Sequence, residues 1–303
     1  MVEGSSSTKG QLVVNFPKAI SEFESAMHKF PVKKILYRNL FRGKGLEFDS
    51  YRVFQQDDDA SLIDWKASLR SNQILAKKYI EERELNVYFL VDVSNGMLFG
   101  SENKLKSEYA AEFVASLAHL VLGAGDKIGL VMFSDRIVKF LRPSRTKNQF
   151  ALFSKFLSDS RLYGGGFGVD RVIDDVLRTV KSPYSIFILV SDFIKMREEN
   201  MGSLKSMGTR FESVAVMIRD RLDEDLPDTD CQIAVQDPYS GRQMILDPNI
   251  ARERYKKNVL KQKEMVRNIA KKSRIDLLDL TTDKGFVVAL SSFLRGRAMG
   301  ARL

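Results

Sequence analysis

Residues 85–97 read Leu-Asn-Val-Tyr-Phe-Leu-Val-Asp-Val-Ser-Asn-Gly-Met, and this stretch decides the fold. Its run Val87 to Val91 consists of β-branched, aromatic and aliphatic side chains, which is typical of a parallel strand buried under helices on both faces. Asp92 stands at the carboxyl end of that strand. Because ligands bind at the carboxyl ends of strands in open α/β sheets, Asp92 and Ser94 are placed to bind one small cation together. A structural role is equally open, in which Asp92 caps the following turn and Ser94 begins the next helix.

The chain after this strand alternates helix and strand patterns. Apolar spacing from Leu105 to Leu120 predicts a helix that ends at Gly123–Gly125, and further strands are expected at 127–133, 185–192, 210–218 and 275–280. Helices are expected at 147–157, 168–180, 195–207 and 282–294. Residues 136–141 predict an antiparallel neighbour of the strand 127–133. The pattern therefore indicates an α/β fold, a doubly wound and mostly parallel sheet with one antiparallel edge strand.

A second carboxylate, Asp192, ends another of the expected central strands. Because parallel strands end at the same edge of a sheet, Asp92 and Asp192 are expected to lie side by side with the hydroxyl of Ser94 between them. Oxygen ligands of this kind suit Mg²⁺, which also retains water. Ser191 could supply a further oxygen.

Two sequence motifs resemble a known family. Asp92-Val-Ser94-Asn-Gly96-Met97 resembles the Asp-x-Ser-x-Ser metal-ion-dependent adhesion motif of von Willebrand factor A domains. The upstream segments Gly45-Leu-Glu-Phe, Asp57-Asp58 and Ile63-Asp-Trp are similar to the signature of the A-domain-like family known as domain of unknown function 58, although Gln56 stands where that signature has glycine. The resemblance implies a von Willebrand factor A-like, Rossmann-like fold.

The resemblance also implies what the cation site lacks. In A domains a second serine, a threonine and a carboxylate from the partner complete the metal shell. Here Gly96 replaces the serine, and the loop expected to supply the threonine reads Gly164-Gly-Gly166-Phe167-Gly168. Two missing hydroxyl ligands weaken a hydrated Mg²⁺ site or leave it to water. The metal residues predicted are Asp92, Ser94 and Asp192, and the same three residues with Phe167 form the predicted partner-binding crevice.

The amino-acid composition excludes several classes of protein. The 303 residues carry one cysteine, Cys231, and two histidines, His28 and His119, which leaves no intramolecular disulfide and no thiolate or imidazole zinc site. No apolar run has the length of a membrane span, and residues 1–10 lack a signal-peptide core, so a cytoplasmic protein is expected. The predicted organisation is a flexible tail (1–12), a helical and β extension (13–82), and an A-like domain (83–303) with an insertion at 219–248, whose segments 233–236 and 243–246 read as a hairpin.

The net charge of +9 has a local origin in residues 251–274, which carry ten Lys or Arg against two Glu. Their apolar residues recur at helical spacing, so this segment is an amphipathic helix with a basic solvent face. Tyr255 is the one aromatic residue of the segment, so aromatic side chains do not alternate with the basic ones, and nucleic acid is therefore not the expected partner.

A second acidic cluster lies in the extension. Asp57–Asp59 and Asp64 could bind a cation or pair with arginine, but capping of turns is the favoured interpretation, with Trp65 as an apolar anchor.

For function, the sequence offers no Ser/His/Asp or Cys/His set and no phosphate-binding loop. We therefore expect a non-catalytic adaptor. The family resemblance implies a MoxR-type AAA+ ATPase as its partner, in the assembly or activation of other proteins. The alternative is a Mg²⁺-dependent hydrolase or nuclease that uses Asp92 and Asp192.

Overall fold

The structure, a computed structural model, describes residues 11–28, 47–55, 60–80, 84–101 and 104–298. By their contacts these residues form two compact units. Of the described residues, 11–28 and those from 86 onward belong to the first unit, and 47–55, 60–80, 84 and 85 belong to the second. Each unit is described separately.

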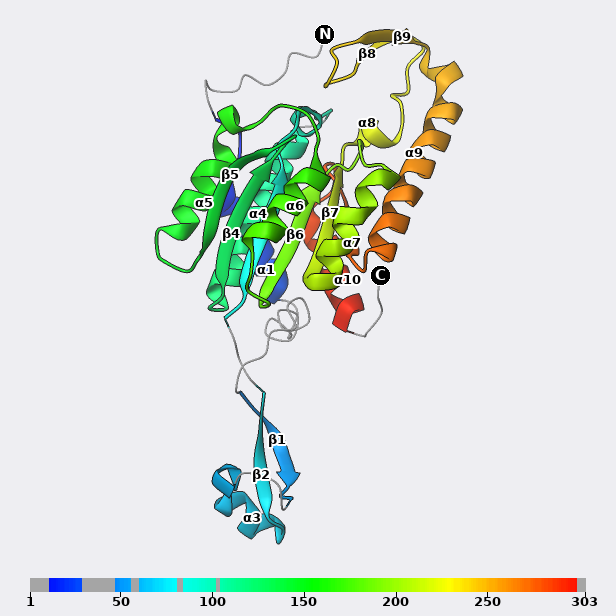
Figure 1. Cartoon of the computed structure of the whole chain (residues 1–303). Coiled ribbons are helices and arrows are strands. Elements are labelled where there is room, and N and C mark those ends of the chain that lie inside the picture. Colours follow the sequence, from blue (N-terminus) through cyan, green and yellow to red (C-terminus); the bar gives the residue numbers. More distant parts are fainter. Residues whose placement is uncertain (1–10, 29–46, 56–59, 81–83, 102–103, 299–303) are drawn as a thin grey trace. The chain divides into compact units, whose positions relative to one another are not determined.

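The first unit is built on a six-stranded sheet in the order β10-β7-β6-β3-β4-β5 (Figure 1). All neighbouring strands are parallel except β4 and β5, which are antiparallel. The predicted fold class is therefore confirmed. The strand bounds are β3 Asn86–Asp92, β4 Lys127–Phe133, β5 Ile137–Ser144, β6 Ser185–Ser191, β7 Glu212–Arg219 and β10 Asp276–Thr281.

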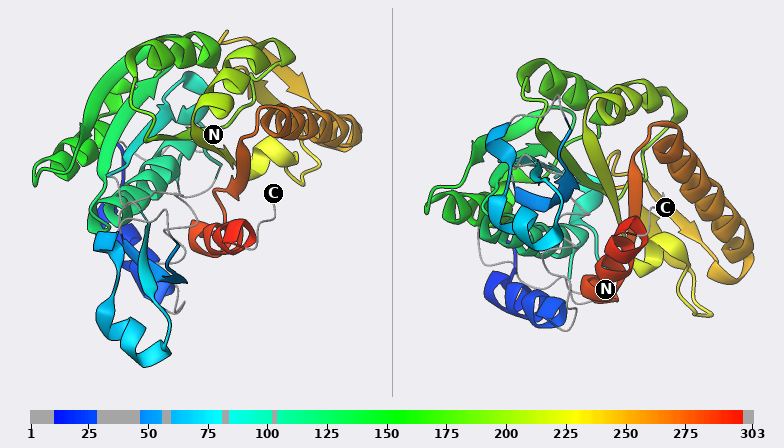
Figure 2. Two further views of the ribbon diagram at one scale, coloured as in Figure 1. Left: turned by 60° about the horizontal axis from the view of Figure 1, so that its bottom comes forward. Right: turned by 90° about the horizontal axis from the view of Figure 1, so that it is seen from below.

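Helices cover both faces of this sheet, as the two views of Figure 2 show. One face carries α6 (Val169–Thr179), α7 (Met201–Arg210) and α9 (Pro248–Lys272). The other face carries α4 (Lys106–Gly123), α5 (Gln149–Ser158) and α10 (Phe286–Ala298). Short turns of helix complete the unit: η2 (Asn95–Leu98), η3 (Ser160–Leu162), η4 (Glu198–Asn200) and α8 (Arg221–Glu224).

The central strands are buried on both faces because their side chains are apolar at successive positions. On one face Tyr88 stacks on Phe187 with ring centroids 5.4 Å apart, and on the other Phe89 meets Phe153 edge to face at 5.5 Å. Each such buried ring contributes about 1.5–3 kcal/mol relative to an exposed one. This two-sided burial fixes β3 in the middle of the sheet, and with it the position of Asp92.

The predicted extension of residues 13–82 is wrong in one respect, because its first helix belongs to the first unit. Helix α1 (Phe16–His28) packs on α4 and α10 of the first unit, where Phe23 is buried and its ring lies 6.2 Å from that of Phe286. The chain before it is also fixed, because the Leu12 amide donates to the Ser158 carbonyl at 2.9 Å. Residues 11–28 therefore belong to the A-like unit, because their apolar side chains complete its core. Residues 29–46 of the predicted extension lie outside the described residues.

The helix expected at 195–207 begins later, at Met201. The preceding residues form the turn η4, in which the Asn200 side chain accepts from the Arg197 amide at 2.9 Å. Local side-chain to backbone bonding of this kind competes with helix formation. Among the helices that the structure describes, none is long and apolar enough to cross a membrane.

The second unit contains an antiparallel pair, β1 (Glu47–Val53) and β2 (Leu75–Ile80), with η1 (Ala60–Leu62) and α3 (Trp65–Ser71) between them. Asp64 caps α3 by accepting from two backbone amides, each at 3.1 Å. Trp65 is 65% exposed, so its expected role as an apolar anchor is wrong. It stands on the first turn of a short helix whose apolar residues the unit does not cover. The expected roles of Asp57–Asp59 fall outside the described residues.

Candidate functional site

The sheet brings Asp92 and Asp192 to the same edge. Asp92 is the last residue of β3, Asp192 follows β6, and the two strands are direct neighbours with Val91 opposite Val190. Both carboxylates are fully buried. The hydroxyl of Ser191 donates to Asp92 Oδ2 at 2.5 Å and so joins the two strand ends.

Asp92 also has the structural role that its sequence left open. Its Oδ1 accepts from the Ser94 amide at 2.8 Å, which closes a turn at the strand end. Burial raises the pKa of Asp92 to about 7, and the nearby charge of Asp192 adds to this, while the hydrogen bonds from Ser191 and Ser94 act in the opposite direction. Both oxygens of Asp92 therefore have donors within the protein.

Lys106 supplies the positive charge of the site. It is the first residue of α4 and only 1% exposed, and its Nζ donates to Asp192 Oδ2 at 2.7 Å and to Asp223 Oδ2 at 2.9 Å. Burial acts to lower the pKa of Lys106, but the two carboxylates outweigh burial and raise it. Lys106 is therefore a charged ammonium group at neutral pH, paired on two sides.

Tyr239 fills the space next to Ser94. Its hydroxyl lies 3.0 Å from Ser94 Oγ, and Gly96 makes room for it. A Cβ atom at position 96 would stand 2.6 Å from the tyrosine hydroxyl and 2.8 Å from Asp192 Oδ2, closer than non-bonded atoms approach. The residue that replaces the second serine of the adhesion motif is therefore the residue that admits Tyr239. Burial and the charge of Asp192 raise the pKa of Tyr239.

Tyr239 belongs to the turn between β8 (Ile233–Gln236) and β9 (Gln243–Leu246), the hairpin that the sequence predicted. We call residues 237–241 the hairpin tip. Besides the contact between Tyr239 and Ser94, the side chains of Asn95 and Lys195 hold the hairpin tip on the site. Asn95 Nδ2 donates to the Pro238 carbonyl at 3.0 Å. Lys195 Nζ lies 3.8 Å from Asp237 and 4.8 Å from the centroid of the Tyr239 ring. The hairpin itself stands at the top of Figure 1, beyond the carboxyl end of the sheet.

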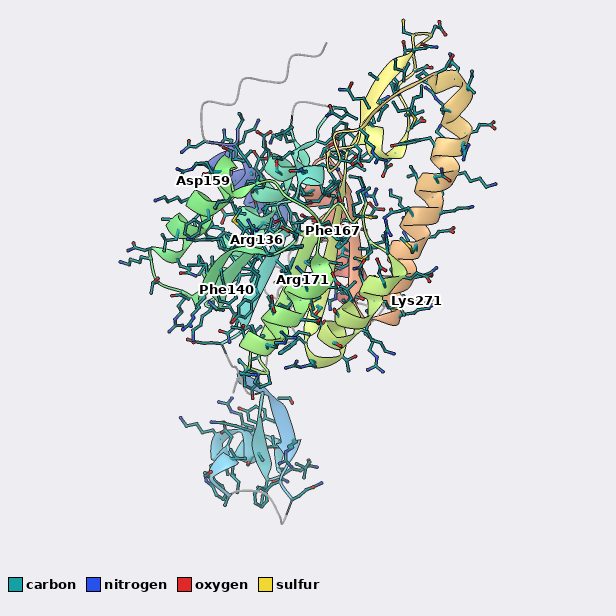
Figure 3. The ribbon with its side chains drawn as sticks, turned by 45° about the horizontal axis from the view of Figure 1, so that its top comes forward. Arg136, Phe140, Asp159, Phe167, Arg171 and Lys271 are labelled. Atoms are coloured by element: carbon teal, nitrogen blue, oxygen red, sulfur yellow. The ribbon has the colours of Figure 1, made fainter. Side chains whose placement is uncertain are left out.

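The glycine-rich loop passes close to the strand end, as its composition suggests. The Gly164 amide donates to the Val93 carbonyl at 2.6 Å, and the Asn95 amide donates to the Gly165 carbonyl at 3.0 Å. Gly164 and Gly165 have φ angles of 125° and 96°, which only glycine adopts readily. Phe167, labelled in Figure 3, follows this loop and packs partly against the apolar core, so only part of its ring is available to a partner.

These contacts do not fit a bound Mg²⁺ ion. Such an ion needs free oxygen ligands and space for its waters. Asp192 instead accepts from Lys106, both oxygens of Asp92 have donors, and Ser94 Oγ is bonded to Tyr239. Mg²⁺ at this site thus stays a prediction from sequence that the observed contacts do not support.

A buried polar network continues from the site toward β10. Asp223 bonds Lys106 and also accepts from the Asp220 amide at 2.9 Å. Asp220 is fully buried and accepts from Ser101 Oγ at 2.5 Å and from Thr282 Oγ1 at 3.0 Å. Burial acts to raise the pKa of Asp220, but these hydrogen bonds prevail and lower it. Hydrogen bonds therefore connect Lys106, through Asp223 and Asp220, to Thr282, which follows the edge strand β10.

Sequence reasoning missed Lys106 and did not assign a role to Tyr239. The sequence held a weak indication for Lys106, because a lysine in the first turn of a helix is disfavoured by the helix dipole and therefore needs another stabilising contact. The sequence held no such indication for Tyr239, because it is an ordinary turn residue whose proximity to Ser94 arises only from the fold.

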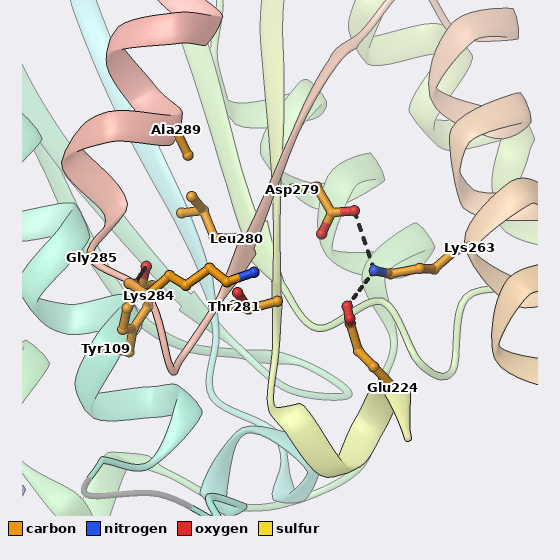
Figure 4. A pocket seen from close by; sticks show the side chains of 9 residues that line it. All are labelled: Tyr109, Glu224, Lys263, Asp279, Leu280, Thr281, Lys284, Gly285 and Ala289. Carbon is orange, nitrogen blue, oxygen red and sulfur yellow. Dashed lines mark hydrogen bonds and ion pairs between the residues drawn. The ribbon is translucent and has the colours of Figure 1, made fainter. Parts of the chain in front are cut away.

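The basic helix α9 is partly used within the protein. Lys263 pairs with Glu224 and lies 3.4 Å from Asp279, in a pocket of about 230 Å³ beside β10 (Figure 4). Lys256 lies 2.9 Å from Asp225, whereas Lys261 is exposed. The basic face of α9 is therefore smaller than its sequence suggests.

The order of the sheet and the helices on both of its faces define the class of protein, which is an α/β protein with a von Willebrand factor A-like fold. The sequence pattern of the family described as "Protein of unknown function DUF58" matches residues 50–265, and the chain belongs to that family.

Individual proteins and solved structures are also similar to this chain. Rv1480 of Mycobacterium tuberculosis and Mb1516 of Mycobacterium bovis, both described as uncharacterized proteins, are each 26% identical over 266 residues, which is 86% of this chain and 83% of theirs. The conserved hypothetical protein BatB from Bacteroides thetaiotaomicron has a similar structure, with a TM-score of 0.50, 15% identity, and coverage of 71% of this chain and 99% of BatB. The SpRpn10 VWA domain matches with a TM-score of 0.40 at 11% identity over 69% of this chain and 95% of that domain. At 15% identity the likeness to BatB shows the fold alone.

Proposed function

We propose that the chain is a non-catalytic adaptor of the cytoplasm that docks a protein partner at the crevice of Asp92, Ser94, Phe167 and Asp192. The partner that the family resemblance suggests is a MoxR-type AAA+ ATPase, coupled through this chain to the assembly or activation of other proteins. One observation carries the proposal: the hairpin tip is already bound there, with Tyr239 on Ser94 and Pro238 on Asn95. A crevice that binds a turn of its own chain has the shape and hydrogen-bonding groups to bind a turn of another.

The hairpin tip also sets a condition on docking. Asp92, Ser94 and Asp192 are fully buried, so a partner reaches them only when the tip moves away. The apparent affinity is then reduced by the fraction of molecules in which the site is open. Loss of the Tyr239 hydrogen bond removes about 0.5–1.5 kcal/mol from the closed form and should strengthen docking about 2- to 10-fold.

Capture of the purified ATPase by immobilised chain tests the proposal. Tyr239→Ala should strengthen capture by that factor. Asp92→Ala and Asp192→Ala should weaken it about tenfold or more, as truncations at the centre of an interface do. Circular dichroism would establish that each variant is folded. Lys261→Ala is the matched control, because Lys261 is exposed on α9 and outside the crevice. If Lys261→Ala abolishes capture while the aspartate variants bind normally, the docking face lies on α9.

The alternative function, a Mg²⁺-dependent hydrolase or nuclease, is tested on the same preparation. It predicts turnover of phosphodiesters or phosphomonoesters that requires Mg²⁺ and is lost in Asp92→Ala. The contacts favour the adaptor, because Asp192 is bonded to Lys106 and both oxygens of Asp92 accept hydrogen bonds from the protein, which leaves the two carboxylates poorly suited to hold the Mg²⁺ that the hydrolase needs.

A further inference from the structure

The inference begins with the buried charges of the site. Asp92 and Asp192 are fully buried, Asp223 is nearly so, and Lys106 is 1% exposed. Buried carboxylates are stable only when a cation or several donors compensate them. Among the residues that the structure describes, Lys106 is the cation bonded to Asp192 and to Asp223. Its ammonium group therefore compensates the charge for which an A domain uses a metal ion.

The position of Lys106 in its helix supports this role. It opens α4, where the helix dipole favours an acidic residue and disfavours a cation. Its aliphatic stem is buried as well, since the whole side chain is nearly inaccessible. Neither helix formation nor solvation explains a lysine here, whereas two carboxylates within 3 Å of its Nζ do.

The space for a hydrated ion is also taken. The Tyr239 hydroxyl bonds Ser94 and occupies the volume that a side chain at Gly96 would need. An arriving divalent ion would have to displace this hydroxyl, at a cost of about one hydrogen bond, and to approach an ammonium group of the same sign in a site shielded from water, where repulsion is strong. The ammonium group of Lys106 is therefore the larger of the two barriers.

We infer that Lys106 replaces the divalent cation of the adhesion site, with Tyr239 in the volume of the missing serine, so that this crevice is assembled without metal. The inference is independent of the proposed partner, because it concerns the free protein. It predicts that removing the ammonium group converts the crevice into a Mg²⁺-responsive site.

The test compares the thermal unfolding of the unchanged protein and of Lys106→Met with and without about 10 mM MgCl₂ at neutral pH. The unchanged protein should show no response to Mg²⁺. Lys106→Met should unfold at a lower temperature, and Mg²⁺ should raise its Tm by about 5 °C or more, the shift expected of an ion near 100 times its Kd. Lys261→Met, exposed on α9, is the control and should behave like the unchanged protein.

Two results would overturn the inference. The first is saturable Mg²⁺ binding by the unchanged protein in calorimetry that disappears in Asp192→Asn. The second is a folded Lys106→Met variant without any Mg²⁺ response. If Lys106→Met fails to fold, the double variant Lys106→Met, Asp223→Asn takes its place. It removes one charge of each sign and leaves Asp92 and Asp192 unchanged. The same two results would overturn the inference for this variant.

Discussion

The hydroxyl oxygens of Ser94 and Tyr239 lie 3.0 Å apart, although 145 positions separate the two residues in the sequence. This contact joins the end of the central strand to the tip of an otherwise exposed hairpin. It places a turn of the same chain beside the strand ends that carry Asp92 and Asp192.

The first prediction concerns Gly96. Gly96→Ser should release the hairpin tip, because the added Cβ would stand 2.6 Å from the Tyr239 hydroxyl. Limited proteolysis should then cut the hairpin at residues 233–246 faster than in the unchanged protein. Gly202→Ser is the matched control, since a Cβ at that position meets nothing within 4 Å. Equal cleavage rates in Gly96→Ser and the unchanged protein would show that the tip is not held by this contact.

The second prediction concerns the pH dependence of stability. The pKa of Asp92 is raised from 3.8 to about 7 by burial and by Asp192, so the folded state binds its proton more tightly than the unfolded state. The stability that this proton contributes is complete below about pH 4 and is lost as the pH rises toward 7. Asp92→Asn cannot titrate and keeps the acceptor for the Ser94 amide. It should therefore stabilise the protein at pH 8, by up to roughly 3 kcal/mol, and have little effect near pH 4.

Urea denaturation across this pH range measures the difference. Asp174→Asn on the exposed side of α6 is the matched control for the removal of one carboxylate. A constant difference between Asp92→Asn and the unchanged protein from pH 4 to pH 8 would contradict the raised pKa.

The third prediction separates two lysines of α9. The Lys263 side chain is 12% exposed and pairs with Glu224 and Asp279, whereas Lys261 is exposed. Lys263→Ala removes a cation that Glu224 and Asp279 share, although Arg267 still lies 3.2 Å from Asp279. It should lower the free energy of unfolding by about 1–2 kcal/mol, between the values for surface and buried pairs. Lys261→Ala should change it by less than about 0.5 kcal/mol. Equal effects of the two substitutions in urea denaturation would argue against the ion pairs of Lys263.

The fourth prediction concerns the cap of α3 in the second unit. Backbone hydrogen bonding, from Ala67 first, lowers the pKa of Asp64 to about 2, against an opposing effect of desolvation, and Lys77 at 3.2 Å adds to the lowering. The cap therefore stabilises this unit above about pH 4, and its contribution is lost as the pH falls toward 2. Asp64→Ala should speed hydrogen exchange in Trp65–Ser71 at neutral pH, whereas Asp64→Asn, which also caps helices, should do so less. Unchanged exchange in Asp64→Ala would mean that the helix does not depend on its cap.

The sequence alone determined the sheet and the ends of its strands. Apolar runs such as Val87–Val91 and 185–192 have one stable placement, between two layers of helices, and a strand buried on both faces carries the residue after it to the sheet edge. The adjacency of Asp92 and Asp192 and the β8–β9 hairpin followed from such local patterns and were predicted. The boundary of the first unit was not, because α1 joins it through contacts of Phe23 with residues far along the chain.

Only the tertiary structure decided what surrounds the two carboxylates. Lys106 reaches Asp192 across 86 positions and Tyr239 reaches Ser94 across 145, and neither contact leaves a periodic pattern in the chain. A lysine near a helix start and a tyrosine in a turn are each compatible with solvent exposure. Lys106 becomes a buried cation because helix packing brings it to carboxylates that burial has already deprived of water, and there the pairing of charge outweighs its own cost of desolvation. Tyr239 becomes the partner of Ser94 because the fold of the insertion brings its hydroxyl to that residue.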